Sequence, residues 1–240
     1  MRRVLIHCVL FIVVLLSQGV RASAQSATNG KPSVPQFDEW TEEFNGDKLD
    51  DKKWEKFTFE GASGGKLEVK DGQIQIRSTG KTRAGIRTRE SFSGDKFAVE
   101  GRVAKVGAAY PDPGSNASTL GFATLTILFD GSGRNRIEWM VTSEGTMEAW
   151  SVIEGRGERL DNRKLGTKMK DPVLLVVRKG DEFSFYINDT KGGPQDAQLG
   201  LTSTLKNLPK AFHVMLYGYG SSENNWDGVR VVVPKSRQEM

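Results

Sequence analysis

Hydrophobic and polar positions between residues 37 and 234 alternate with a period of two rather than with a helical period. The clearest unit is a hairpin, because aliphatic and polar residues alternate in both K-L-E-V-K (66–70) and Q-I-Q-I-R (73–77). Asp71-Gly72 between these runs suits a type I′ turn. A helix is conceivable only at 196–208, where Gly200 opposes it. The pattern therefore predicts strands joined by turns.

Short alternating runs of this kind continue to the end of the region, and the chain contains no internal repeat. Its 27 glycines suit many turns. Strands of this number and spacing predict a single all-β domain, a sandwich or a barrel. Further predicted strands lie at residues 96–106, 119–129, 136–141, 147–153, 173–178, 183–188, 212–219 and 229–233.

The first residues have the pattern of a secretory signal peptide. Arg2 and Arg3 precede the apolar run 4–16, and Ala22-Ser23-Ala24 resembles a cleavage site. The run is too short to span a membrane, and no second long apolar run follows. We therefore expect export to the periplasm or the extracellular medium. The predicted division of the chain is a signal peptide (1–24), a flexible linker (25–36), one domain (37–234) and a tail (235–240).

Removing this leader changes the charge and the cysteine content of the chain. Three of the 34 basic residues lie in 1–24, which has no acidic residue, so 31 basic residues remain against 30 acidic ones. No basic patch follows, and we expect no nucleic-acid partner. The single cysteine, Cys8, also lies in the leader. The mature chain therefore has no disulfide, and its stability must come from its hydrophobic core.

Several segments, in this order, resemble the concanavalin A-like lectin/glucanase superfamily, and laminarinase-type domains in particular. This resemblance implies a two-sheet antiparallel β-sandwich, the jelly roll. It does not fix the function, because the superfamily holds hydrolases, lectins and adhesion modules. The segments are 42–54 (E-E-F-N-G-D-K-L-D-D-K-K-W), 69–76 (V-K-D-G-Q-I-Q-I), 84–103, 183–189 (F-S-F-Y-I-N-D) and 224–231 (N-N-W-D-G-V-R-V).

The resemblance implies an E-x-D-x-E motif on a central strand in the hydrolytic members, because residues two apart face the same cleft. The corresponding strand here reads R-I-E-W-M-V, with Glu138 as its only carboxylate. Arg136, Met140 and Thr142 share its face, and Arg136 opposes a general-acid role. The motif is therefore absent, and a lone strand glutamate is usually one half of an ion pair.

A second carboxylate lies on the next predicted strand, where Glu148 and Trp150 share a face. If the two strands pair, Glu138 and Glu148 could face the same cleft, and a divergent hydrolase or lyase would use them. Their separation depends on a register that the sequence does not give.

The sequence gives little support for a serine nucleophile, a catalytic histidine or a His/Cys metal site. Gly61-Ala62-Ser63-Gly64-Gly65 matches G-x-S-x-G, but no helix follows to make a nucleophile elbow. The mature chain has one histidine, His213, in an apolar run, where a structural role is commoner than a catalytic one. One histidine and no cysteine exclude a His/Cys metal cluster.

The resemblance also implies a structural calcium ion that joins the first strand region to the last. Carried over by motif, Asp227 would give its carboxylate, and Glu43 and Gly72 would give carbonyl oxygens. Calcium takes six to eight oxygen ligands of these kinds. The alternative is that Asp227 only caps a turn before Gly228.

Aromatic and amide side chains supply candidates for a sugar site, since indole and phenol rings stack on pyranose faces and amides pair with hydroxyls. Core packing is the alternative for each aromatic residue. We therefore predict an exported, non-catalytic carbohydrate-binding protein, with a divergent glycoside hydrolase and a protein-binding adhesion domain as alternatives. The candidates are Trp139, Trp150, Tyr217, Tyr219, Asn224, Asn225 and Trp226.

Overall fold

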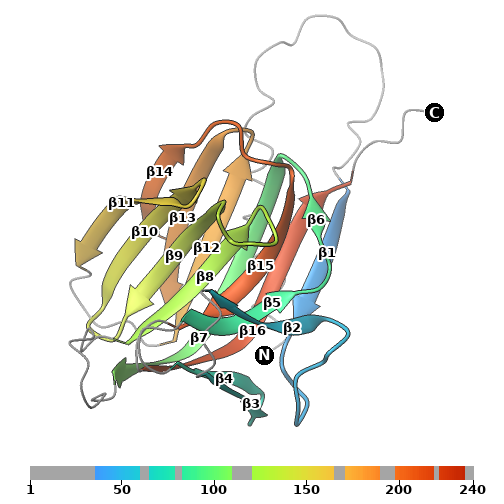
Figure 1. The fold of residues 1–240 in the computed structure, drawn as a ribbon, viewed down its shortest axis with the longest axis vertical. Helices are drawn as coiled ribbons and strands as arrows, with labels where there is room; N and C mark the ends of the chain where they lie inside the picture. Colours follow the sequence, from blue (N-terminus) through green and yellow to red (C-terminus); the bar gives the residue numbers. More distant parts are fainter. Residues whose placement is uncertain are drawn as a thin grey trace, which may run out of the picture.

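The computed structural model describes residues 36–59, 65–78, 83–109, 121–164, 171–189, 198–218 and 222–235. Sixteen strands and no helix occur within these ranges, which confirms the predicted all-β class (Figure 1). Accordingly, no helix in this part of the chain could cross a membrane. The predicted signal peptide and the Ser63 loop lie outside the described residues. The only segment for which a helix was considered contains a strand instead, β14 (Gln198–Thr204).

The strands form two antiparallel sheets of eight strands each. The first sheet has the order β14-β13-β12-β7-β16-β4-β3, and β1 pairs with β16 beside this path. Its other strands are β1 (Phe37–Glu42), β3 (Lys66–Lys70), β4 (Gln73–Arg77), β7 (Lys96–Ala109), β12 (Pro172–Lys179), β13 (Glu182–Asp189) and β16 (Ser222–Pro234).

The second sheet has the order β11-β10-β9-β8-β15-β5-β2, and β6 pairs with β15. Its long strands run in nearly the same direction as those of the first sheet (Figure 1). They are β2 (Trp54–Phe59), β5 (Arg83–Thr88), β6 (Phe92–Ser93), β8 (Phe122–Leu128), β9 (Arg136–Thr142), β10 (Thr146–Ile153), β11 (Arg156–Lys164) and β15 (Ala211–Tyr217).

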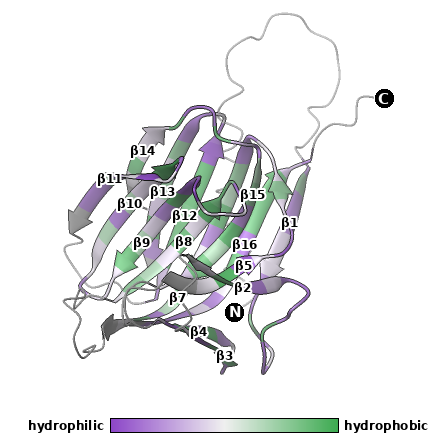
Figure 2. Cartoon of the chain, in the orientation of Figure 1, coloured by the Kyte–Doolittle hydropathy of each residue, from purple (hydrophilic) through white to green (hydrophobic). Residues whose placement is uncertain are grey.

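One hydrophobic core lies between the sheets and holds buried residues of both. Trp139 of the second sheet packs on Phe185 of the first, with ring centroids 5.5 Å apart, and its Nε1 donates to the carbonyl of Tyr186. Hydrophobic residues are concentrated along the middle strands, whereas β11 is largely hydrophilic (Figure 2). The predicted two-sheet sandwich is therefore confirmed.

The predicted hairpin is confirmed in its turn as well as in its strands. Strand β3 pairs with β4 in register from Lys66 opposite Arg77 to Lys70 opposite Gln73. Asp71 and Gly72 both have positive φ, 55° and 73°, as a type I′ turn requires.

Strand β9 is buried on both of its faces. Ile137, Trp139 and Val141 face the core. The alternating residues Arg136 and Glu138 face the opposite way, yet they are also buried. Residues that lie over the outer face of the second sheet therefore shield β9 from water.

Candidate functional site

A cavity of about 520 Å³ lies on the outer face of the second sheet. Its walls come from β8, β9, β10, β11 and β15 and from the turn between β10 and β11. Half-buried aromatic rings and charged groups both contribute to them. The lining residues are Phe122, Arg136, Glu138, Met140, Glu148, Trp150, Val152, Gly155, Gly157 and Tyr217.

The strand register arranges the floor of this cavity in rows that cross the strands, because directly paired residues share a face. Neighbours within a row are about 4.5–5.5 Å apart at Cβ. One row consists of Tyr217, Thr124, Met140 and Glu148, and the next consists of Met215, Thr126, Glu138 and Trp150.

The pair formed by Arg136 and Glu138 is the most buried charged feature of the cavity. Arg136 Nε donates to Glu138 Oε1 at 2.5 Å, and Arg136 Nη1 donates to the carbonyl of Gly133 at 2.5 Å. Their side chains are 10% and 5% exposed. Glu138 is therefore held as an ion-pair acceptor. A carboxylate that attacks or protonates a glycosidic bond has to be directed at the ligand instead.

The second carboxylate is engaged by different partners. Glu148 Oε2 accepts from Trp150 Nε1 at 2.9 Å, and its Oε1 accepts from Asn162 Nδ2 at 3.4 Å. The Arg159 guanidinium lies 5.9 Å from the centroid of the Trp150 ring. Glu148 thus fixes the direction of the indole.

The structure places Glu138 and Glu148 in one cavity wall, as their predicted common face requires. They are not directly paired, since Glu138 lies opposite Trp150 and Glu148 lies opposite Met140. The two carboxylates are diagonal neighbours on adjacent strands. Each one already holds a partner from the chain itself.

Of the aromatic candidates, Trp150 lines the cavity with a half-buried ring. Tyr217 also belongs to the lining, but it is 1% exposed and packs in a buried hydrophobic cluster, so it forms part of the wall and offers no free ring face. Tyr219 lies outside the described residues. Trp139 and Trp226 are corrections to the predicted sugar site, since they are 1% and 0% exposed and belong to the core. A pyranose ring cannot reach either indole face.

The structure also removes the two candidate amides, Asn224 and Asn225, from the predicted sugar site. Asn224 is completely buried, where its amide donates to the Phe122 carbonyl and accepts from Trp226 Nε1 at 2.6 Å. Asn225 is 7% exposed and donates to Gln73 Oε1 on the neighbouring strand of the first sheet. Both amides therefore bind the protein itself, away from the cavity on the second sheet.

The residues predicted to hold calcium are joined by an arginine. Arg102 Nη2 donates to Glu43 Oε2 at 2.7 Å, and its Nε donates to Asp227 Oδ1 at 3.1 Å. The same guanidinium donates to the carbonyl of Asp227 at 3.2 Å. Gly72 lies in the β3–β4 turn. The Asp227 carboxylate that was expected to face a cation thus faces a guanidinium, and Glu43 joins it through its side chain rather than through its carbonyl.

The charges in this cluster shift one another's titration. Burial raises the pKa of Asp227 above its ordinary value, more than Arg102 lowers it. Burial alone would lower the pKa of Arg102, but the hydrogen bond and charge of Glu43 raise it. No group of three or more His, Cys, Asp or Glu side chains suited to a metal occurs in the described ranges. The calcium site, which would also use the carbonyls of Glu43 and Gly72, stays a prediction.

The loop 130–135, between β8 and β9, is held rigidly beside the cavity. Asp130 accepts hydrogen bonds from the Ser132 hydroxyl and from the backbone and side chain of Asn135. Burial raises the pKa of Asp130, but these hydrogen bonds outweigh it and hold the pKa below its ordinary value. The Gly133 carbonyl of this loop is the one that Arg136 binds.

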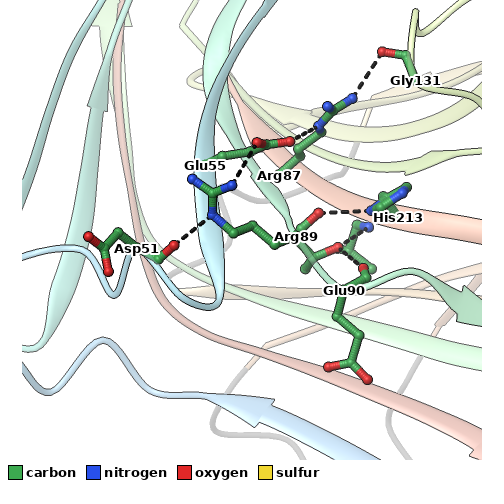
Figure 3. Close-up of polar contacts among 9 residues, drawn as sticks. Asp51, Glu55, Arg87, Arg89, Glu90, Gly131 and His213 are labelled. Atoms are coloured by element: carbon green, nitrogen blue, oxygen red, sulfur yellow. Dashed lines mark hydrogen bonds and ion pairs between the residues drawn. The ribbon is translucent and has the colours of Figure 1, made fainter.

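A network on β2 and β5 ties the same loop to the other end of the second sheet (Figure 3). Arg87 donates to Glu55 at 2.6 Å and to the Gly131 carbonyl at 2.9 Å, and Arg89 also binds Glu55. The hydrogen bond from Arg87 is the main reason that the pKa of Glu55 is lowered. His213 Nδ1 lies 2.8 Å from the Thr88 carbonyl, in agreement with a structural role.

The sequence matches no protein-family model and no curated protein. Solved structures do resemble it. A β-agarase A in complex with oligoagarose is 10% identical with a TM-score of 0.62, covering 83% of this chain and 94% of the other. A Bacillus licheniformis β-glucanase is 12% identical with a TM-score of 0.57, over 82% and 98%.

A carbohydrate-binding protein gives a similar result. The CBM2 module of an evolved Dit from Lactobacillus casei BL23 phage J-1 is 10% identical with a TM-score of 0.57, covering 84% of this chain and 98% of that one. Identities this low show the fold alone. They confirm the predicted jelly-roll sandwich, a fold that the agarase, the glucanase and the CBM2 module share.

Proposed function

We propose that this chain is an exported, non-catalytic carbohydrate-binding protein that holds a polysaccharide in the cavity of the second sheet. The observation that carries the proposal is which side chains of the cavity wall are free to face a ligand and which are bound by their neighbours. Trp150 offers a half-buried, oriented indole, whereas Glu138 and Glu148 are both bound by neighbouring side chains. An oriented indole suits stacking on a sugar ring, and a carboxylate held in a buried ion pair, as Glu138 is, is not directed at a ligand.

The fold is consistent with this proposal. Similar structures include a carbohydrate-binding module and enzymes that act on agarose and β-glucan, as their names state. The predicted signal peptide supports export, where polysaccharides are available.

Affinity electrophoresis in gels that contain agarose, laminarin or lichenan tests the binding. We expect retardation of the purified protein by at least one neutral polysaccharide, and about tenfold weaker binding by Trp150→Ala. Tyr186→Ala is the matched control, because Tyr186 is also a half-buried strand aromatic but lies on the first sheet. Its binding should be unchanged. If none of the polysaccharides retards the protein, the proposal is contradicted.

The divergent hydrolase remains the second candidate, because Glu138 and Glu148 do lie in one cavity wall. Incubating the same polysaccharides with the protein and measuring reducing ends decides between the two functions. We expect no product. Sugar release that disappears in Glu138→Gln or Glu148→Gln would identify an enzyme.

A further inference from the structure

The orientation of Trp150 depends on two neighbours, Glu148 and Arg159. Glu148, two residues earlier on β10, accepts the indole N–H, and Asn162 of β11 steadies that carboxylate. Residues two apart on a strand face the same side, so this bond holds the ring along the strand rather than letting it rotate. A half-buried tryptophan without such a bond would sample several rotamers.

A β-bulge brings the second neighbour into place. Strand β10 pairs with β11 with Ala149 opposite Asp161, but with Trp150 opposite Arg159. Leu160 is therefore an extra residue on β11, and it packs at the margin of the core. Bulges re-aim the side chains beside them. This one directs the exposed Arg159 onto the Trp150 ring.

The charges of the cavity wall restrict the class of ligand. Arg136 and Glu138 neutralise each other within the wall, and Glu148 contributes a further negative charge. The exposed Arg159 lies on the Trp150 ring and is not among the lining residues. An anionic sugar that entered this cavity would approach two carboxylates, and Arg136, the cation among the lining residues, is already paired with one of them. Repulsion of this kind inside a partly enclosed site is costly.

The cavity also has a direction. Trp150 on β10 and Tyr217 on β15 are separated by β9 and β8, which amounts to three strand spacings. At about 4.8 Å per spacing the separation across the strands is about 14 Å, which a short oligosaccharide can span. Tyr217 also lies one row away from Trp150 along the strands. Met140 lies between them and offers an apolar floor.

We propose that Glu148 and Arg159 are positioning residues that hold Trp150 as the stacking platform for an uncharged polysaccharide, whose chain crosses the strands from Trp150 towards Tyr217. Arg159 covers one face of the indole, and the opposite face receives the sugar. This inference rests on the proposed function for its ligand, but not for the orientation of Trp150.

The comparison of Glu148→Gln with Glu148→Ala tests the positioning. Glutamine keeps an oxygen that accepts the indole N–H, whereas alanine removes it. With laminarin and agarose as probes, we expect Glu148→Gln to bind within about twofold of the parent protein and Glu148→Ala to bind about tenfold more weakly. Glu158→Ala, at an exposed residue of the neighbouring strand β11, is the matched control and should not change binding. Equal losses in the two Glu148 variants would show that its charge meets the ligand directly, and would overturn the positioning role.

Acrylamide quenching of tryptophan fluorescence gives a readout that needs no ligand. Trp54, Trp139 and Trp226 are fully buried, so quenching reports mainly on the two half-buried tryptophans, Trp150 and Trp40, and a Trp150→Phe variant identifies the share of Trp150. We expect Glu148→Ala to increase that share and Glu148→Gln to leave it unchanged. Unchanged quenching in Glu148→Ala would overturn the inference whether or not a glycan binds.

The ligand class is tested with a sulfated polysaccharide, carrageenan, beside the neutral probes. We expect binding to the neutral chains and none to carrageenan at physiological ionic strength. Binding to carrageenan alone would overturn the uncharged class and leave the carbohydrate-binding function intact. Binding to neither kind would contradict the proposed function itself.

Discussion

Arg136 and Arg102 each lie among carboxylates, one on each sheet, but water reaches the two clusters to different extents. The side chains of Arg136 and Glu138 are 10% and 5% exposed. Arg102 is 20% exposed, and its partners Glu43 and Asp227 are 43% and 39% exposed. The first pair is therefore part of the packed structure, whereas the second is a partly solvated clamp.

This difference decides what each arginine does. A buried charge without a partner is very unfavourable, so Arg136 and Glu138 each require the other. Partly solvated charges can be hydrated again when a partner is lost, so the clamp contributes only moderately. Both arginines stand where the resemblance implied a functional group, a catalytic carboxylate near Glu138 and a calcium ion near Asp227.

The largest effect is expected from Arg136→Met, which removes the cationic partner of the buried Glu138 carboxylate. We expect the free energy of unfolding to fall by about 3–5 kcal/mol, measured by urea denaturation at pH 7. The double variant Arg136→Met/Glu138→Leu removes both charges and should recover most of the loss. A loss below about 1 kcal/mol in the single variant would mean that water solvates Glu138 after all, and the contrast between the clusters would disappear.

Arg102→Ala is expected to have a smaller effect, a loss of about 1–2 kcal/mol, because Glu43 and Asp227 regain water. Raised salt should reduce this difference further. In the parent protein, calcium or a chelator should leave the melting midpoint unchanged, since Arg102 already compensates both carboxylates. A calcium-dependent rise in the midpoint would show that the ion binds despite the guanidinium.

The smallest effect is expected from Asp130→Asn. Asp130 lies in the loop 130–135, whose Gly133 carbonyl accepts a hydrogen bond from Arg136. The folded pKa of Asp130 is lowered, so its contribution is complete above the unfolded pKa of about 3.9 and is lost as the pH falls through the folded value. We expect the variant to be about 1 kcal/mol less stable at pH 7 and almost equal to the parent at pH 2. Urea denaturation at both pH values measures this, and a difference that does not change with pH would refute the assigned titration.

Much of the fold follows from local patterns. The hairpin at 66–77 could be predicted because Asp71-Gly72 determines its turn and alternation determines its two faces. The alternation along β9 also carried information that the predicted sugar site did not use. Glu138 and Trp139 are adjacent on one strand, so they cannot both face the cavity. Once Glu138 is assigned to the cavity, Trp139 belongs to the core.

The candidate site was harder to predict from the sequence than the fold, because it depends on contacts between residues that are distant in sequence. Asn224 and Trp226 fall between the predicted strands 212–219 and 229–233, but β16 begins at Ser222 and carries both into the sheet. Arg102 is 125 residues from Asp227, so no local motif indicates their contact. The bulge that pairs Trp150 with Arg159 is a property of the register between two strands, which single-strand patterns do not contain.

The same bulge has a consequence for how the protein behaves in concentrated solution. Among the described strands, β11 is the last of the second sheet, and an edge of this kind could recruit another strand into an intermolecular sheet. The extra Leu160 interrupts the regular edge, and R-G-E-R-L-D-N-R-K places charged side chains along it. Both features oppose aggregation. A variant that straightened β11 to alter the sugar platform would therefore also remove this protection, so ligand specificity and solubility are coupled at one irregular strand.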